Sequence, residues 1–88
     1  MKTLFFYSGL IIIMIFPLPA DATPFENWFI QANMFYEKHE FDSAAGYYEK
    51  IIAGGLQNSG IYYNLANAYF RLNKLGLAIL NYEKARKL

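Results

Sequence analysis

The chain has 88 residues, of which 56% are hydrophobic and 19% aromatic, so it is too apolar to stay disordered and long enough for one small domain or part of a larger one. Eight basic and seven acidic residues leave a net charge of +1, without the basic stripe that a nucleic-acid partner requires. The sequence has no cysteine, which excludes disulfides, thiolate nucleophiles, cysteine-ligated metals and an acylated lipoprotein anchor.

The N-terminal segment has the composition of a secretory signal peptide. Lys2 precedes thirteen uncharged residues at 4–16, two prolines follow, and Ala-Asp-Ala at 20–22 supplies the small residues that signal peptidases accept. A helix over the apolar run is about 20 Å long, which is less than the roughly 30 Å hydrocarbon core of a bilayer. We therefore predict a hydrophobic signal helix over 1–22, cleaved after Ala22, with an uncleaved anchor as the alternative. Either way the rest of the chain is exported, to a bacterial periplasm or cell envelope.

The first helix of the mature chain is expected to begin next to this cleavage point. Thr23 as N-cap, Pro24 at the first helical position and Glu26 three residues after the threonine form a helix start signal. The apolar residues that follow have the i, i+4, i+7 spacing of one helix face: Trp28, Ala32 and Phe35.

A second helix is predicted after a polar break at residues 37–40. Its apolar face consists of Phe41, Ala44, Ala45, Tyr48, Ile51 and Ile52. Gly54 and Gly55 end this helix, because glycine accepts the left-handed conformation of a C-cap. Asn58 or Ser59 then caps the next helix.

Residues 59–88 repeat residues 25–58 at an offset of 34 without a gap. Six pairs of positions are identical: Ala32/Ala66, Asn33/Asn67, Ala44/Ala78, Tyr48/Tyr82, Glu49/Glu83 and Lys50/Lys84. Four more exchange one aromatic residue for another: Trp28/Tyr62, Phe29/Tyr63, Phe35/Tyr69 and Tyr36/Phe70. The apolar residues of the second unit are Tyr62, Leu65, Ala66, Tyr69, Leu75, Ala78, Ile79, Tyr82 and Ala85. A repeat of this period predicts an all-α fold of two antiparallel helical hairpins.

The alanines of the repeat have a steric role in this prediction. Ala32 and Ala66 are placed where the two helices of a hairpin approach most closely, with Ala44 and Ala78 at the facing positions. A larger side chain there would force the helices apart by overpacking.

This spacing of aromatic and small residues resembles the tetratricopeptide repeat. In the first unit the pattern falls on Trp28, Ala32, Phe35, Ala44, Tyr48 and Ile51. In the second unit it falls on Tyr62, Leu65, Ala66, Tyr69, Ala78, Tyr82 and Ala85. The departures are Gln31 where leucine is usual, Ile51 in place of the late alanine, and the lack of a proline at the repeat junction. The resemblance implies a fragment of an α-solenoid, with repeats at 25–58 and 59–88, the second incomplete. More narrowly, residues 62–69 and 75–83 are similar to exported repeat proteins of bacterial aerotolerance (Bat) operons.

The resemblance also implies a partner-binding groove on the first helix of each hairpin. The groove-facing positions are Phe29, Asn33, Tyr36, Glu37, Tyr63, Asn67, Phe70 and Arg71. In similar repeats an asparagine at such a position holds the backbone of an extended peptide, offering both a donor and an acceptor. The alternative is that both asparagines are ordinary surface residues and that the aromatics pack against a further neighbour. Arg71 has no basic counterpart, so a clamp for a C-terminal carboxylate is not expected.

Catalysis, cofactor binding and metal binding are not expected. His39, the single histidine, lies among loop carboxylates without the spacing of a metal site. No Gly-rich phosphate loop or nucleophile–base pair accompanies the acidic residues, so neither an enzyme nor a small-molecule substrate is predicted.

The end of the sequence leaves the second unit four residues short of its period. Because repeat arrays generally need at least three units and a polar terminal helix, we expect a fragment of a longer protein or, less favoured, self-association through the open C-terminal end. The leading functional hypothesis is an exported protein-interaction scaffold that binds a partner peptide or helix. The alternatives are a purely structural repeat segment of an envelope protein and an accessory part of an enzyme whose catalytic domain lies beyond residue 88. Contact with a membrane would come only through a retained signal segment or further C-terminal sequence.

Overall fold

The structure is a computed structural model that describes residues 24–88 of the chain. The predicted signal peptide and the predicted N-cap Thr23 lie outside the described residues. The described part is all-helical, without a strand, and its helices are α1 (Pro24–Glu37), α2 (Phe41–Ala53), α3 (Ser59–Arg71) and α4 (Leu75–Lys87). None of these four helices has the length and apolarity needed to cross a membrane.

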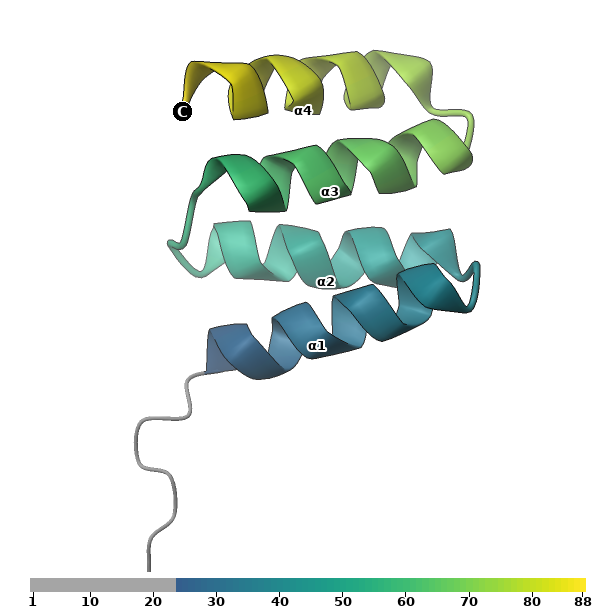
Figure 1. The fold of residues 1–88 in the computed structure, drawn as a ribbon, viewed down its shortest axis with the longest axis vertical. Helices are drawn as coiled ribbons and strands as arrows, with labels where there is room; N and C mark the ends of the chain where they lie inside the picture. Colours follow the sequence, from purple (N-terminus) through teal and green to yellow (C-terminus); the bar gives the residue numbers. More distant parts are fainter. Residues whose placement is uncertain (1–23) are drawn as a thin grey trace, which may run out of the picture.

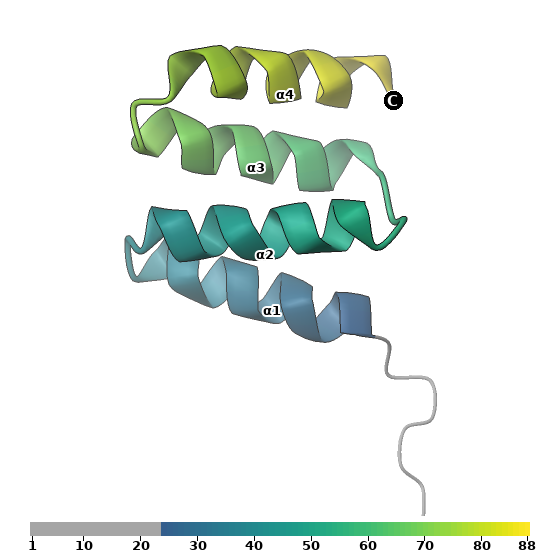
Figure 2. The same cartoon turned by 180° about the vertical axis from the view of Figure 1, so that it is seen from behind.

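The four helices stack in chain order, each antiparallel to the one before it (Figure 1). The packed pairs are α1 with α2, α2 with α3 and α3 with α4. The view from behind shows the same order, with the C-terminus at the end of α4, the outermost helix of the stack (Figure 2). The expected pair of helical hairpins is therefore confirmed, with one hairpin built from α1 and α2 and the other from α3 and α4.

The turns inside the two hairpins have the same backbone conformation. His39 and Asn73, 34 residues apart, both adopt a left-handed conformation, with φ of 63° and 62°. The N–H group of the next residue donates to a carbonyl five residues earlier in each turn, from Glu40 to Phe35 at 2.8 Å and from Lys74 to Tyr69 at 2.9 Å. This is the Schellman arrangement, which satisfies carbonyls that the end of a helix leaves without partners.

The connection between the hairpins begins with the same hydrogen bond, from the N–H of Leu56 to the carbonyl of Ile51 at 3.3 Å, but it uses glycine at the positive-φ position. Gly55, with φ of 109°, takes the positive-φ position after α2, whereas Gly54 remains right-handed. Gly54 makes room for Phe25, because a β-carbon there would lie 2.7 Å from the ring of Phe25 and the ring would have to move. Of the two candidate caps for α3, the structure selects Asn58, whose Oδ1 accepts a hydrogen bond from the N–H of Ile61 at 2.9 Å.

The core has small residues at the contact between the helices of each hairpin, as expected. Ala32, Ala44, Ala66 and Ala78 are at most 1% exposed. Five of the other predicted packing residues are also buried: Tyr48, Tyr62, Leu65, Tyr69 and Ala85. The remaining three are partly buried: Trp28, Phe35 and Tyr82.

One cation–π contact recurs at the same position of each hairpin. The ammonium group of Lys50 lies 5.0 Å from the ring centroid of Trp28, and that of Lys84 lies 5.6 Å from the ring centroid of Tyr62. Both residues of the second pair are 34 positions after those of the first, so the repeat in the sequence is also a repeat of contacts.

The two hairpins differ on the outer side of their second helix, which is covered by another helix in the first hairpin only. Ala45 on α2 is buried against the rest of the stack, but Ile79, its counterpart on α4, is 62% exposed. Leu75, also predicted on the apolar face of the last helix, is exposed as well. Both residues belong to the apolar pattern of the second unit, but they stay uncovered because, within residues 24–88, no helix packs on the outer side of α4.

Candidate functional site

The first helices of the two hairpins, α1 and α3, border two hollows on one side of the stack. We call these the polar hollow, of about 280 Å³, and the apolar cavity, of about 410 Å³. The polar hollow is lined by Asn33, Tyr36, Glu37, Tyr48, Asn64 and Asn67. Asn64 lines both hollows, so they form one continuous surface, which we call the groove.

Two equivalent hydrogen bonds position the asparagines of the groove. The hydroxyl of Tyr48 on α2 donates to Oδ1 of Asn33 on α1 at 2.5 Å. The hydroxyl of Tyr82 on α4 donates to Oδ1 of Asn67 on α3 at the same distance. In each hairpin, therefore, a tyrosine from the second helix engages the amide oxygen of an asparagine on the first. The NH₂ group of each amide is left as the free donor, since an amide has its acceptor and its donors on different atoms.

The tyrosine hydroxyls remain protonated, and therefore able to donate, at neutral pH. Burial raises the pKa of Tyr48 to about 12, the nearby Tyr36 adds to this effect, and a side-chain hydrogen bond with Asn64 opposes it. Burial also raises the pKa of Tyr82. Asn64 thus meets Tyr48 from α3, so that one phenol contacts amides of both helices that border the groove.

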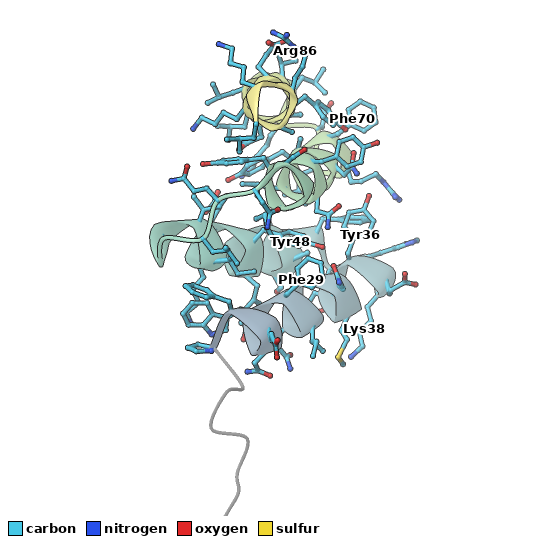
Figure 3. The ribbon with its side chains drawn as sticks, turned by 60° about the vertical axis from the view of Figure 1, so that its left-hand side comes forward. Phe29, Tyr36, Lys38, Tyr48, Phe70 and Arg86 are labelled. Atoms are coloured by element: carbon cyan, nitrogen blue, oxygen red, sulfur yellow. The ribbon has the colours of Figure 1, made fainter. Side chains whose placement is uncertain are left out.

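Aromatic rings on the groove side pack edge-on against these tyrosines. The ring of Phe29 lies 6.3 Å from that of Tyr48, and the ring of Tyr63 lies 5.6 Å from that of Tyr82. Tyr63 and Phe70 are more than half exposed. Tyr36 and Phe70 project toward the same side of the stack (Figure 3). These rings offer apolar contact area beside the amide donors.

The charged residues predicted for the groove have separate positions. Glu37 is exposed and lines the polar hollow. Arg71 lines neither hollow, because its guanidinium group lies 4.4 Å from the ring centroid of Phe41 at the start of α2. Phe41 also contacts the rings of Tyr36 at 5.0 Å and His39 at 5.4 Å. The groove therefore has an acidic residue within it and a basic residue held at the end that carries the hairpin turns.

The structure brings together five of the eight predicted groove residues. Asn33, Tyr36, Glu37 and Asn67 line the polar hollow, and Phe29 lines the apolar cavity. Tyr63, Phe70 and Arg71 are exposed but line neither hollow.

Three residues of α2, α3 and α4 have polar roles that were not predicted from the sequence. Asn64 was not identified, although its place one turn before Asn67 on the same helix was an available signal. Tyr48 was assigned to packing alone, yet its hydroxyl orients a groove residue. Asn81 is buried on α4, where its Nδ2 donates to the carbonyl of Leu77 at 2.8 Å, and its spacing carried no signal of this role.

Residues 24–88 hold no group of three or more His, Cys, Asp or Glu side chains placed to bind a metal ion. His39 contacts an aromatic ring, as described above, in an exposed turn.

Comparison of the chain with known protein families, curated proteins and solved structures gives no match.

Proposed function

We propose that this chain is an exported protein-interaction module, similar to tetratricopeptide repeats, that binds an extended peptide segment of a partner protein in the groove between α1 and α3. The observation that carries the proposal is the pair of tyrosine–asparagine hydrogen bonds, which recur 34 residues apart with the same length and direction. Each bond occupies an amide oxygen and leaves an NH₂ donor beside the polar hollow.

Donors arranged in this way suit the backbone of an extended peptide. A peptide in extended conformation rises about 3.3 Å per residue and presents its carbonyl oxygens on alternating sides. Asn33 and Asn67 border the hollow from different helices, so the carbonyl oxygens of one segment can meet donors on both sides. A tyrosine hydroxyl takes one of the two acceptor positions of each amide oxygen, so the groove offers mainly donors, whereas the sequence alone predicted both a donor and an acceptor.

The exposed aromatic rings support a protein partner over a small ligand. Tyr63 and Phe70 are 54% and 57% exposed on α3, the helix that borders both hollows. Rigid aromatic side chains of this kind contribute contact area at a low cost in side-chain entropy. A segment several residues long can contact both rings and the amides, whereas a molecule confined to the polar hollow reaches neither ring.

The decisive experiment replaces the groove-facing donor while keeping the tyrosine bond. Asn67→Asp retains an oxygen that accepts from Tyr82 and substitutes a carboxylate oxygen for the NH₂ group. We expect this variant to fold normally and to bind the partner peptide at least about tenfold more weakly, because a carboxylate repels carbonyl oxygens. Asn73→Asp is the matched control, since it adds the same charge in the turn before α4. Equal binding by the parent and Asn67→Asp would refute the proposal.

A purely structural role is the second candidate, and it rests on a different surface. Ile79, Leu80 and Leu88 are exposed on or just after α4. These apolar side chains are suited to packing against further helices of an envelope protein. Under this alternative, Ile79→Glu prevents assembly while Asn67→Asp has no effect, and under the binding proposal the effects are reversed.

Export is the third part of the proposal, and it depends on residues 1–22 alone. Protein recovered from the periplasm of an expressing bacterium should begin at Thr23 if the signal peptide is cleaved after Ala22. Recovery of the protein from the cytoplasm with Met1 retained would contradict this.

A further inference from the structure

The apolar cavity lies between the N-terminal halves of α1 and α3, at the end of the groove away from Arg71. Its apolar lining consists of Phe25, Phe29, Ile51, Leu56 and Ile61. Polar groups of Glu26, Asn58 and Asn64 complete the lining. A volume of about 410 Å³ lies near the lower end of the range for sites that bind small ligands. It is large enough for one bulky side chain and too small for a folded element.

Gly60 leaves this cavity open. It lines the cavity on α3, and its counterpart on α1 is Glu26. A β-carbon at Gly60 would lie 3.5 Å from Oδ1 of Asn58, an ordinary contact, and the residue has no positive φ. Neither backbone conformation nor close packing therefore requires glycine at this position. Because glycine has no side chain, the apolar residues that line the cavity remain accessible.

The charge of the polar hollow limits what can lie beside an apolar side chain in the cavity. Glu37 is the only charged residue that lines the polar hollow. Arg71 is held over Phe41 outside it. The electrostatic interaction with the Glu37 carboxylate favours a cationic side chain in the polar hollow and disfavours an acidic one.

The spacing of the two hollows sets a register for the bound segment. Phe29 and Asn33 are four residues apart on α1, which is about 6 Å along the helix axis. An extended segment covers this distance in about two residues. A side chain in the apolar cavity and a carbonyl oxygen at the Asn33 amide would therefore come from positions about two residues apart.

We propose that the apolar cavity is the anchor site of the groove: it takes one aromatic or branched aliphatic side chain of an extended partner segment, and a lysine or arginine of the same segment lies in the polar hollow. This inference rests on the proposed function and specifies the partner sequence that the groove selects.

The test uses the full 88-residue chain in a mild detergent and a phage-displayed library of random nine-residue peptides. Enriched peptides are synthesised with acetylated and amidated ends and titrated by fluorescence anisotropy in the same detergent. We expect them to share one bulky apolar residue and a lysine or arginine within about four residues of it. Replacing that apolar residue with alanine should weaken binding to the parent chain by about tenfold or more.

The matching protein variant is Gly60→Leu, which fills the cavity and improves helix propensity. It should melt no lower than the parent and bind the enriched peptides about tenfold more weakly or worse. Gly76→Leu is the control, because Gly76 is likewise the second residue of its helix and a β-carbon there meets nothing within 4 Å. Its binding should change by less than about twofold.

Several outcomes overturn the anchor site. The anchor proposal is wrong if Gly60→Leu binds the enriched peptides as tightly as the parent chain does. It is also wrong if the enriched peptides lack an apolar residue, or if replacing that residue with alanine leaves binding unchanged. If Asn67→Asp still abolishes binding in that case, the groove function stands without the anchor. If neither variant affects binding, the proposed function fails as well. If Gly60→Leu changes only the sedimentation of the chain, a second copy occupies the cavity and the anchor proposal is wrong.

Discussion

Removal of one buried hydroxyl tests whether the tyrosine–asparagine bond ties the first hairpin together. Tyr48 is 2% exposed and its hydroxyl donates to Asn33 across α1 and α2. Tyr48→Phe deletes that donor, and with it the hydroxyl that Asn64 also meets, and keeps the ring, so packing around the ring is retained. The expected loss in the free energy of unfolding is about 0.5–1.5 kcal/mol for the bond to Asn33, the net value of one such hydrogen bond, with a further contribution from the bond to Asn64.

The second hairpin supplies a matched control for this change. Tyr82→Phe removes the same bond to Asn67, but Tyr82 is only partly buried, so water can replace the lost donor more readily. We expect the loss in Tyr82→Phe to be the smaller of the two. Both are measured by urea unfolding followed by circular dichroism at 222 nm.

Two results would refute the reasoning about Tyr48. An unchanged free energy of unfolding in Tyr48→Phe would mean that the bond contributes nothing. A larger loss for Tyr82→Phe would mean that burial does not decide the contribution. Tyr48→Phe should also weaken peptide binding. Without the tyrosine donor the Asn33 amide is free to rotate, and its NH₂ group is no longer directed to the groove.

Three further predictions follow from burial and backbone geometry. The pKa of Tyr48 is raised to about 12 in the folded chain, so as the pH rises the unfolded chain loses this proton first. The free energy of unfolding of the parent should therefore fall between pH 10 and pH 12 relative to that of Tyr48→Phe. A constant difference in the free energy of unfolding between the two proteins across that range would contradict this. Ala44→Leu should lower the free energy of unfolding by about 1–3 kcal/mol through overpacking, whereas Ala53→Leu, on the exposed end of the same helix, should have little effect in the same urea titration. Asn73→Ala should lower stability by about 1–2 kcal/mol because alanine disfavours the left-handed conformation, and Asn73→Gly should not; equal melting temperatures for the two variants would rule out this explanation.

The hairpins were predictable because every level of the sequence indicates the same arrangement. The 34-residue repeat, the alanine pairs and the turn residues each favour two helices per unit, and the structure places Ala44 and Ala78 in equivalent buried positions. Residues from Pro24 to Glu37 are helical, as expected. Periodicity alone determines which face of a helix is apolar, so the elements that both units share were found correctly.

Features that depend on neighbouring helices were harder to predict. The position of Arg71 over Phe41 depends on how α3 lies against α2, which no spacing within one helix reveals. The same is true of Asn64, which meets Tyr48 only because two hairpins stack.

The residue types of the groove were predictable from the sequence, but the orientation of the asparagine amides was not. Asn33 and Asn67 were identified as groove residues, and the structure places both at the polar hollow. Which atom of each amide is free depends on the tyrosine that reaches it from the following helix. Tyr48 and Tyr82 are identical in the two units, but a phenol that packs and a phenol that donates a hydrogen bond have the same sequence signal.

The most direct test of the peptide-binding groove is to observe its amides during binding. In a ¹H–¹⁵N spectrum of the chain, addition of an enriched peptide should shift the side-chain NH₂ signals of Asn33, Asn64 and Asn67. The buried amide of Asn81, which donates to its own helix, serves as the internal control and should stay in place. Shifts at Asn81 and the backbone of α4 with unchanged groove amides would contradict the account.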